Sequence, residues 1–278
     1  MVYDRDDYVV SSELQQQERL LLRLFDPLDS LVIFDVGACE GENAVRYGRL
    51  FPRAHVYAVE PLPGNLALLR RTVEKFGAHN VKPIDGCLSD EEAEADFHVS
   101  SGVPPEFADG DVDWDFGNKS SSLLSPDGTS TVHPWLKFKD SIKVTTSRLD
   151  GLALKLDVTH IDFLHMDVQG AELKVLQGAG TLLSRTWAVW LEVEAAPLYL
   201  GQPLATEVEA FMSRHGFVKL LDTVGEVSGD QFWSSASWLK ERKGVTWVSI
   251  ARFKQSRALA WVAHRVKRVC SADRRSSD

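Results

Sequence analysis

The sequence has few cysteines, no long hydrophobic run and no excess of positive charge. Its three cysteines, Cys39, Cys87 and Cys270, are far apart and odd in number, which excludes a disulfide framework, and no CxxC or CxxxH spacing indicates a zinc site. No apolar run approaches the roughly 20 residues that span a bilayer, and the acidic N-terminus does not have the basic and apolar regions of a signal peptide. A net charge of -9 argues against a surface that coats nucleic acid. These absences favour a cytoplasmic protein with no nucleic-acid partner.

Five short apolar runs are of the kind that is buried on both faces of a parallel sheet. They lie at residues 31–36, 55–60, 81–85, 161–167 and 188–194. The segments between them show helical periodicity, as at Leu66, Leu69 and Val73, which share one helical face. After the fifth run, residues 217–222 and 246–253 predict an antiparallel pair that finishes the sheet. The pattern predicts a three-layer α/β fold with a mostly parallel sheet and right-handed crossovers.

The chain divides by composition into three parts. Residues 1–30 predict an N-terminal helical segment whose first 12 residues fray, residues 31–253 form the α/β domain, and residues 254–278 are a basic tail. The tail has seven Lys or Arg against two Asp, and its apolar stripe favours packing on its own domain or on a partner subunit, as in a homodimer, over membrane contact. Within the domain, residues 86–148 are too long for one crossover, so they predict an insertion with hairpins and substrate-side loops.

A glycine-containing loop follows the first predicted strand. Gly37 and Gly41 have the spacing G-x-x-x-G, not the G-x-G-x-x-G of dinucleotide-binding proteins. Three carboxylates surround this loop, those of Asp35, Glu40 and Glu42. They would repel a diphosphate and suit a cation, and Glu60 at the end of the second strand could accept hydrogen bonds from ribose hydroxyls. A cationic, phosphate-free ligand with a ribose describes S-adenosylmethionine; the alternative is that these residues form only a tight turn and a strand end.

The strongest local signal is the block at residues 161–179, IDFLHMDVQGAELKVLQGA. With it, the sequence resembles the FkbM family of S-adenosylmethionine-dependent methyltransferases from about Leu31 to Phe253, so residues 31–253 are expected to be an FkbM-type domain. The other matching blocks are FDVGAxxG at 34–41, VEP at 59–61, CLSD at 87–90, SSSL at 120–123, Val-x-x-x-x-Leu-Asp at 144–150 and Leu-Tyr-x-Gly-Gln-Pro at 198–203. One departure is His165, where the family usually has Lys.

The resemblance implies a class I, Rossmann-like fold with a seven-stranded, mostly parallel sheet and an antiparallel last strand. It also implies O-methyl transfer from S-adenosylmethionine to a hydroxyl of a sugar, glycoside or other natural-product small molecule. On the matching positions, the residues expected to bind the cofactor are Asp35, Gly37, Ala38, Glu40, Gly41, Asn43, Glu60, Pro61, Asp85 and Cys87.

An alcohol acceptor needs a base, which is expected at the carboxyl ends of the fourth and fifth strands, beside the cofactor. Asp167 is the first candidate, and His165 on the same strand face is the second, unless His165 is a hydrogen-bonded core residue. The residues expected on the substrate side are Gln169, Glu172, Glu192, Glu194 and Tyr199, although Glu172 could instead stabilise a helix N-terminus. Asp167 and Glu192 could hold Mg²⁺, but with no ligand triad at close spacing we do not expect a divalent ion to be essential.

Two other classes of function compete with methyl transfer. A non-catalytic ligand-binding or interaction protein could keep the fold, but the complete set of Asp35, Glu60 and Asp167 weighs against it. A nicotinamide oxidoreductase is disfavoured by the glycine spacing and the acidic loop. In the insertion, acids alternate with Trp114 and Trp135, which suits sugar binding or an acidic loop but does not have the spacing of a calcium loop.

Overall fold

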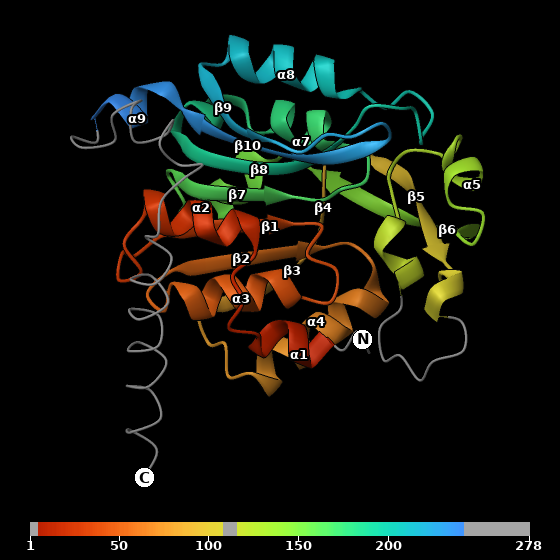
Figure 1. Cartoon of the computed structure of the whole chain (residues 1–278), viewed down its shortest axis with the longest axis horizontal. Coiled ribbons are helices and arrows are strands. Elements are labelled where there is room, and N and C mark those ends of the chain that lie inside the picture. The colour runs from red at the N-terminus through yellow and green to blue at the C-terminus, as the bar shows by residue number, and fades with distance from the viewer. Residues whose placement is uncertain (1–4, 108–115, 242–278) are drawn as a thin grey trace.

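The computed structural model describes residues 5–107 and 116–241 of the chain. Seven strands form one large sheet in the order β3-β2-β1-β7-β8-β10-β9 (Figure 1). They are β1 (Val32–Val36), β2 (His55–Glu60), β3 (Val81–Asp85), β7 (Ile161–Met166), β8 (Thr186–Glu194), β9 (Phe217–Asp222) and β10 (Ser228–Ser235). Neighbours from β3 to β8 pair in parallel, and β10 runs antiparallel to both β8 and β9. The predicted Rossmann-like fold is confirmed.

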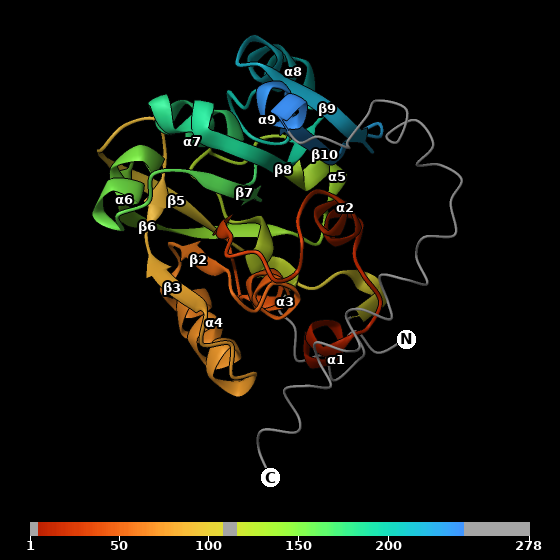
Figure 2. The same ribbon diagram turned by 90° about the vertical axis from the view of Figure 1, so that its left-hand side faces the viewer.

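Helices cover both faces of this sheet. Alternate residues of a strand point to opposite faces, and here the residues on both faces are apolar and are buried under helices. On β1, Ile33 packs into one hydrophobic cluster and Phe34 into another. The Ile33 cluster includes residues of α1 (Arg5–Val10), α2 (Gln16–Leu24), α3 (Glu42–Leu50), α4 (Pro63–Lys75) and α9 (Ala236–Glu241); the Phe34 cluster includes residues of α6 (Leu149–Lys155), α7 (Glu172–Gly178), η3 (Gly180–Arg185) and α8 (Ala205–Arg214). Figures 1 and 2 show α2 and α3 on one side of the sheet and α7 and α8 on the other. Within the described residues, we find no helix with the length and apolar character of a membrane span.

Among the described residues, the strand that pairs with β9 is β10, which the sequence pattern does not predict. The first half of β10 is polar, and its buried polar side chains are paired inside the structure: Trp233 Nε1 donates to Gln231 Oε1 (3.0 Å), and Ser234 Oγ donates to the Trp187 carbonyl (2.9 Å). Hydrophobicity alone therefore does not reveal this strand. Residues 246–253, like the basic tail 254–278, lie outside the described part of the chain.

The N-terminal residues 5–10, which the sequence predicts to fray, instead form helix α1 packed against α3. Tyr8 Oη donates to Asn43 Oδ1 in α3 (2.8 Å). Arg46 of α3 is buried and donates to both carboxylate oxygens of Glu18 (2.7 Å each) and to the Glu13 carbonyl (2.7 Å). A buried ion pair of this kind holds its partners firmly, because removing one would leave the other charge buried and uncompensated. The N-terminal segment thus fixes the helix that follows the glycine loop.

The insertion forms a second sheet beside the first, in which β5 and β6 pair antiparallel. This sheet has the order β4-β6-β5, and it is accompanied by three short helices. The elements are β4 (Cys87–Leu88), β5 (Glu94–Ser101), η1 (Pro105–Phe107), η2 (Phe116–Ser120), α5 (Thr129–Val132) and β6 (Lys137–Ser147). The insertion contacts the segments after β7 and β8: Ser122 Oγ donates to the Gln169 carbonyl (2.7 Å), and Tyr199 Oη donates to the Ser120 carbonyl (2.9 Å). It therefore covers the carboxyl ends of the parallel strands, where ligands of open α/β sheets bind.

Candidate cofactor and acceptor site

The glycine loop between β1 and α3 is pressed against the end of β7. Gly37 has φ +79°, and a Cβ added there would lie 1.9 Å from the carbonyl oxygen of Asp167. Gly41 has φ +84°, and its Cβ would lie 2.2 Å from Leu69 Cδ1 in α4. Both positions favour glycine because the backbone is left-handed, and at Gly37 the backbone of Asp167 also occupies the place of a side chain.

Glu60, at the end of β2, holds this loop in place. Its Oε2 accepts a hydrogen bond from the Cys39 backbone N–H (2.8 Å), and its Oε1 accepts one from the Leu62 N–H (2.9 Å). The side chain is buried, and burial raises the pKa of the carboxyl group to about 7. Near neutral pH, Glu60 can thus be either a neutral or an ionised acceptor.

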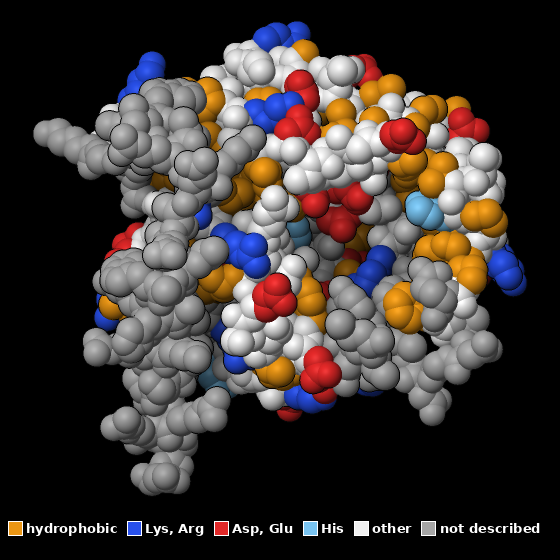
Figure 3. Space-filling model, viewed as in Figure 1, with side chains coloured by type: hydrophobic (Ala, Val, Ile, Leu, Met, Phe, Trp, Pro, Cys, Tyr) orange, Lys and Arg blue, Asp and Glu red, His pale blue; other side chains and the backbone are white. Residues whose placement is uncertain are grey.

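Two clefts meet at the glycine loop. The first, of about 510 Å³, lies along the ends of β1 and β2 and the start of the insertion, and its lining includes the predicted cofactor residues Gly37, Glu60, Pro61 and Cys87. The second, of about 350 Å³, includes the predicted residues Asp35, Gly37, Ala38, Asn43, His165 and Asp167. Both clefts are lined by Gly37, Cys39, Lys119 and Asp167. Figure 3 shows acidic side chains gathered in a hollow on this face of the molecule. One elongated ligand could extend from the first cleft into the second.

Three of the predicted cofactor residues do not line either cleft. Glu40 is fully buried, forms an ion pair with Arg5 and accepts a hydrogen bond from Asn118 Nδ2 (3.2 Å). Gly41 contacts α4, as described above, and Asp85 is exposed at the end of β3. Glu40 and Gly41 therefore lie outside the lining of the two clefts and support the shape of the loop.

Asp35 and His165 lie side by side on neighbouring strands. His165 Nδ1 is 2.6 Å from Asp35 Oδ1, and both side chains are buried. Burial disfavours the charged ring, but the carboxylates of Asp35, Asp167 and Asp230 together outweigh this effect and raise the pKa of His165. The other oxygen, Asp35 Oδ2, is buried and has no hydrogen-bond partner among the described residues. A buried carboxylate oxygen in this state is suited to receive a positively charged ligand group.

Gln169 ties together two carboxylates on the acceptor side. Its Nε2 donates to Asp167 Oδ1 (2.7 Å) and to Glu192 Oε2 (3.0 Å), and its Oε1 accepts a hydrogen bond from Tyr199 Oη (3.1 Å). Gln169 has φ +55° and precedes Gly170 at φ +92°, so a left-handed turn aims the amide between the two strands. Gln169 thus positions the carboxylates of Asp167 and Glu192 relative to each other.

Four carboxyl groups lie close together near the carboxyl ends of β7 and β8, those of Asp167, Glu192, Glu194 and Asp230. Burial, with the neighbouring Asp167 carboxylate, raises the pKa of Glu192 to about 8 and that of Glu194 to about 7. Burial likewise raises the pKa of Asp167 itself and of Asp230, which lies opposite Glu192 on β10. Like charges directly opposite each other destabilise a sheet, so this pairing costs stability in the free protein.

We expect the cofactor-free protein to lose stability as pH rises from about 4.5 to about 8. Glu60, Glu192 and Glu194 have raised pKa values in the folded state, against 4.5 for an unperturbed glutamate. The folded state therefore binds more protons than the unfolded state in this window, and the free energy of unfolding falls as pH rises. Urea unfolding at several pH values measures the slope, which Glu192→Gln should make shallower. The exposed Glu226→Gln is the matched control, and equal slopes for the two variants would contradict the prediction.

Glu172 is predicted on the substrate side, but its side chain contacts the backbone of the turn that precedes α7. It is 3% exposed, and its Oε1 accepts a hydrogen bond from the Val168 N–H (3.0 Å) at the start of α7. Burial and Glu194 raise the pKa of this carboxyl well above its usual value. It does not line either cleft. This placement favours the alternative interpretation of the sequence, in which Glu172 supports the helix start.

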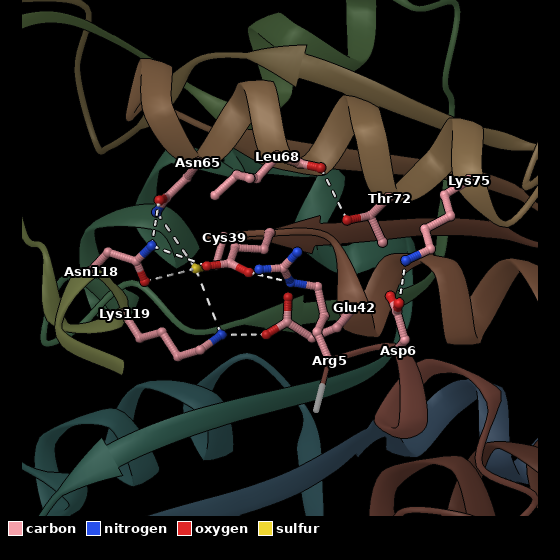
Figure 4. Close-up of polar contacts among 11 residues, drawn as sticks. Arg5, Asp6, Cys39, Glu42, Asn65, Leu68, Thr72, Lys75, Asn118 and Lys119 are labelled. Carbon is pink, nitrogen blue, oxygen red and sulfur yellow. Dashed lines mark hydrogen bonds and ion pairs between the residues drawn. The ribbon is translucent and has the colours of Figure 1, made fainter. Parts of the chain in front are cut away.

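The residues of the site that were not predicted from the sequence include Asn118 and Lys119 of η2. Asn118 Nδ2 donates to Asn65 Oδ1 (2.8 Å) and to Glu40, and Lys119 Nζ forms an ion pair with Glu42. Figure 4 shows both side chains reaching from the insertion to the glycine loop. The one feature of the sequence that could have pointed to them is their position directly before the SSSL block at residues 120–123. Residues 108–115, including the predicted acids and Trp114, lie outside the described part.

The clustered acids do not form a metal centre of their own. Among the described residues, no group of three or more His, Cys, Asp or Glu side chains is placed to hold a metal ion. The independence of the reaction from a divalent ion stays a prediction.

Comparison with known proteins gives consistent matches. A family model described as the methyltransferase FkbM domain matches residues 35–219. The chain is 32% identical over 193 residues to 2-O-methyltransferase NoeI of Sinorhizobium fredii, covering 69% of this chain and 73% of that protein. It is 28% identical over 207 residues to AMB antimetabolite synthetase AmbE of Pseudomonas aeruginosa, covering 67% of this chain and 9% of that protein. Among solved structures, methyltransferase FkbM of Methylobacillus flagellatus aligns with a TM-score of 0.46 and 14% identity, over 84% of this chain and 48% of that one.

Proposed function

This chain belongs to the FkbM methyltransferase family, and from that premise we propose that it transfers the methyl group of S-adenosylmethionine to a hydroxyl of a small molecule such as a sugar, a glycoside or another natural product. The observation that carries the proposal is the pair of joined clefts, lined by Asp35, Glu60 and Asp167 and meeting at the glycine loop. The match to a protein named as a 2-O-methyltransferase supports oxygen as the methyl acceptor.

The residues present suit S-adenosylmethionine. The cofactor supplies an electrophilic methyl group on a sulfonium ion. Glu60 would accept hydrogen bonds from its ribose hydroxyls in the first cleft, where Val59, Pro61 and Leu88 offer apolar surface to the base. In the second cleft, the unpartnered Asp35 Oδ2 would receive a positive group. A phosphate-bearing cofactor would be repelled by these carboxylates, and the loop does not have the G-x-G-x-x-G spacing of pyrophosphate sites.

We propose that Asp167 is the base that accepts the proton of the acceptor hydroxyl. It lies where the two clefts meet, Gln169 holds one of its oxygens, and its raised pKa makes it a stronger base than a solvated aspartate. His165 is the second candidate, since Asp35 orients its ring through Nδ1. Methyl transfer is an in-line displacement, so holding the acceptor oxygen and the methyl group close together and aligned would supply much of the rate acceleration.

Transfer of a labelled methyl group tests the proposal. Purified protein is incubated with S-adenosylmethionine carrying an isotopically labelled methyl and with panels of hydroxylated and amino-bearing small molecules, and the products are analysed by mass spectrometry and NMR. We expect the label on an ether oxygen of a hydroxylated acceptor. Label on nitrogen or carbon would contradict O-methylation, and failure to bind S-adenosylmethionine in calorimetry would contradict the proposal as a whole.

Glu60→Gln should weaken S-adenosylmethionine binding by about 10- to 100-fold, because the ionised carboxylate makes stronger hydrogen bonds to ribose hydroxyls than an amide does. Glutamine retains one oxygen and the shape, so the loop contacts change less than with alanine. Calorimetry measures the affinity, with the exposed Glu74→Gln on α4 as the control. Unchanged affinity in Glu60→Gln would remove Glu60 from the cofactor site.

A further inference from the structure

Lys119 is a lysine of the insertion that reaches the centre of the site. It lies on η2, forms an ion pair with Glu42 at the start of α3, and its Nζ is 3.8 Å from Cys39 Sγ in the glycine loop (Figure 4). It is one of the residues that line both clefts. Lys119 is thus placed at the junction of the two clefts, although it comes from a part of the chain far from the glycine loop in sequence.

The charge of Lys119 stands out against its surroundings. Among the described residues that line either cleft, it has the one ammonium or guanidinium group, whereas Asp35, Glu42, Glu60 and Asp167 all present carboxyl groups. Burial opposes the charge of Lys119, but Glu42, Cys39 and Glu40 together outweigh burial and raise the pKa of the ammonium, so it stays charged. This ammonium would repel a purely cationic ligand, whereas a ligand with an anionic group beside its cationic ones can pair with it.

S-adenosylmethionine has such a combination of charges. Besides the sulfonium, its amino-acid portion carries an α-ammonium and an α-carboxylate. The second cleft contains acceptors for the ammonium, because Asp35 Oδ2 and Glu42 Oε2 are both buried with no hydrogen-bond partner among the described residues. Lys119 is the complementary donor for the carboxylate.

We propose that Lys119 binds the α-carboxylate of the cofactor's amino-acid portion, while Asp35 and Glu42 receive its α-ammonium. This inference rests on the proposed function, since it assigns a subsite of the same cofactor. It makes the insertion part of the cofactor site as well as of the acceptor side, because the ligand would join η2 to the glycine loop. Lys119 then distinguishes cofactors that have an amino-acid portion from nucleosides that do not.

The test compares two ligands in the Lys119→Met variant by calorimetry. S-adenosylhomocysteine carries the amino-acid portion, and 5′-methylthioadenosine has the same adenosine and sulfur without it. We expect Lys119→Met to weaken S-adenosylhomocysteine binding by about 10- to 100-fold, the effect of losing a hydrogen-bonded ion pair, and to change 5′-methylthioadenosine binding by less than about threefold. Lys119→Arg should recover part of the lost affinity.

The control is Lys143→Met, which removes another lysine of the insertion, on β6, that pairs with Asp96 at the exposed surface. It should leave both affinities unchanged. Equal weakening of the two ligands in Lys119→Met would show that Lys119 only fastens the insertion to the loop, and would overturn the inference while leaving the proposed function standing. Unchanged S-adenosylhomocysteine binding would overturn it too. A wild-type protein that binds neither ligand would overturn both the inference and the proposed function.

Discussion

Asp167→Asn is expected to lower kcat by about 10²- to 10⁴-fold, the range for loss of a general base. Asparagine keeps the shape of the side chain, and its Oδ1 can still accept the hydrogen bond from Gln169 Nε2. The substitution therefore removes basicity with little change in geometry. The affinity for S-adenosylmethionine should fall by less than about fivefold, or about 1 kcal/mol, since Asp167 is proposed to contact the acceptor hydroxyl. Steady-state kinetics and calorimetry separate the two effects.

Two further variants complete this test. Asp140→Asn, at an exposed position of β6, should leave kcat unchanged. His165→Asn removes the ring but retains an N–H for Asp35, so it should reduce kcat by less than Asp167→Asn does. The reverse order would assign the base to His165. Near-normal kcat in both site variants would mean that positioning alone carries the reaction and that Asp167 has no role as a base.

Gly37→Ala is expected to destabilise the protein by about 4 kcal/mol or more and to abolish cofactor binding. Such a cost lies at the upper end for a single substitution and reflects two causes, a left-handed backbone and a direct collision. The added Cβ would lie 1.9 Å from the carbonyl oxygen of Asp167 and 2.8 Å from its carbonyl carbon, and both are backbone atoms that a rotamer change cannot move. Relief would require the glycine loop to move away from β7, which would open the junction of the two clefts.

Gly216→Ala provides a matched control for backbone strain. Gly216 has φ +80°, nearly the same as the +79° of Gly37, but a Cβ added at Gly216 would meet no atom of the described residues within 4 Å. It should cost about 1–2 kcal/mol, the strain of the left-handed conformation alone. Urea unfolding of both variants isolates the collision as the difference between them. Equal costs would contradict the close approach of the loop to β7.

The fold and much of the site could be predicted because they depend on local patterns. Buried parallel strands are visible as apolar runs, and their carboxyl ends meet at one edge, which is why Asp35, Glu60 and Asp167 could be assigned to one region before their distances were known. The strand β10 was missed, because its buried Gln231 and Ser234 satisfy their polar groups through side-chain and backbone partners that hydrophobicity does not reveal. Asp230 was missed with it.

The contacts of the insertion could not be predicted for a different reason. Lys119 and Asn118 reach the glycine loop only through the path of the chain between β5 and β6, and no periodicity encodes that path. The sequence also predicts Gln169 and Glu172 on the substrate side. In the structure, Gln169 donates hydrogen bonds to Asp167 and Glu192, and Glu172 accepts one from the Val168 backbone N–H. Residue type and position at a strand end predict where a side chain lies in the fold. They say much less about which residue it forms a hydrogen bond with.

The buried ion pair of Arg46 and Glu18 determines where the chain can be cut without separating two residues that depend on each other. The recognisable family region begins at residue 35, but Arg46 within it is neutralised by Glu18, which lies before that boundary. A shortened chain cut at residue 35 would leave the Arg46 guanidinium without its counter-charge on α3, the helix that follows the glycine loop. Domain exchange between relatives should therefore carry residues 5–24 together with the glycine loop, as one cassette.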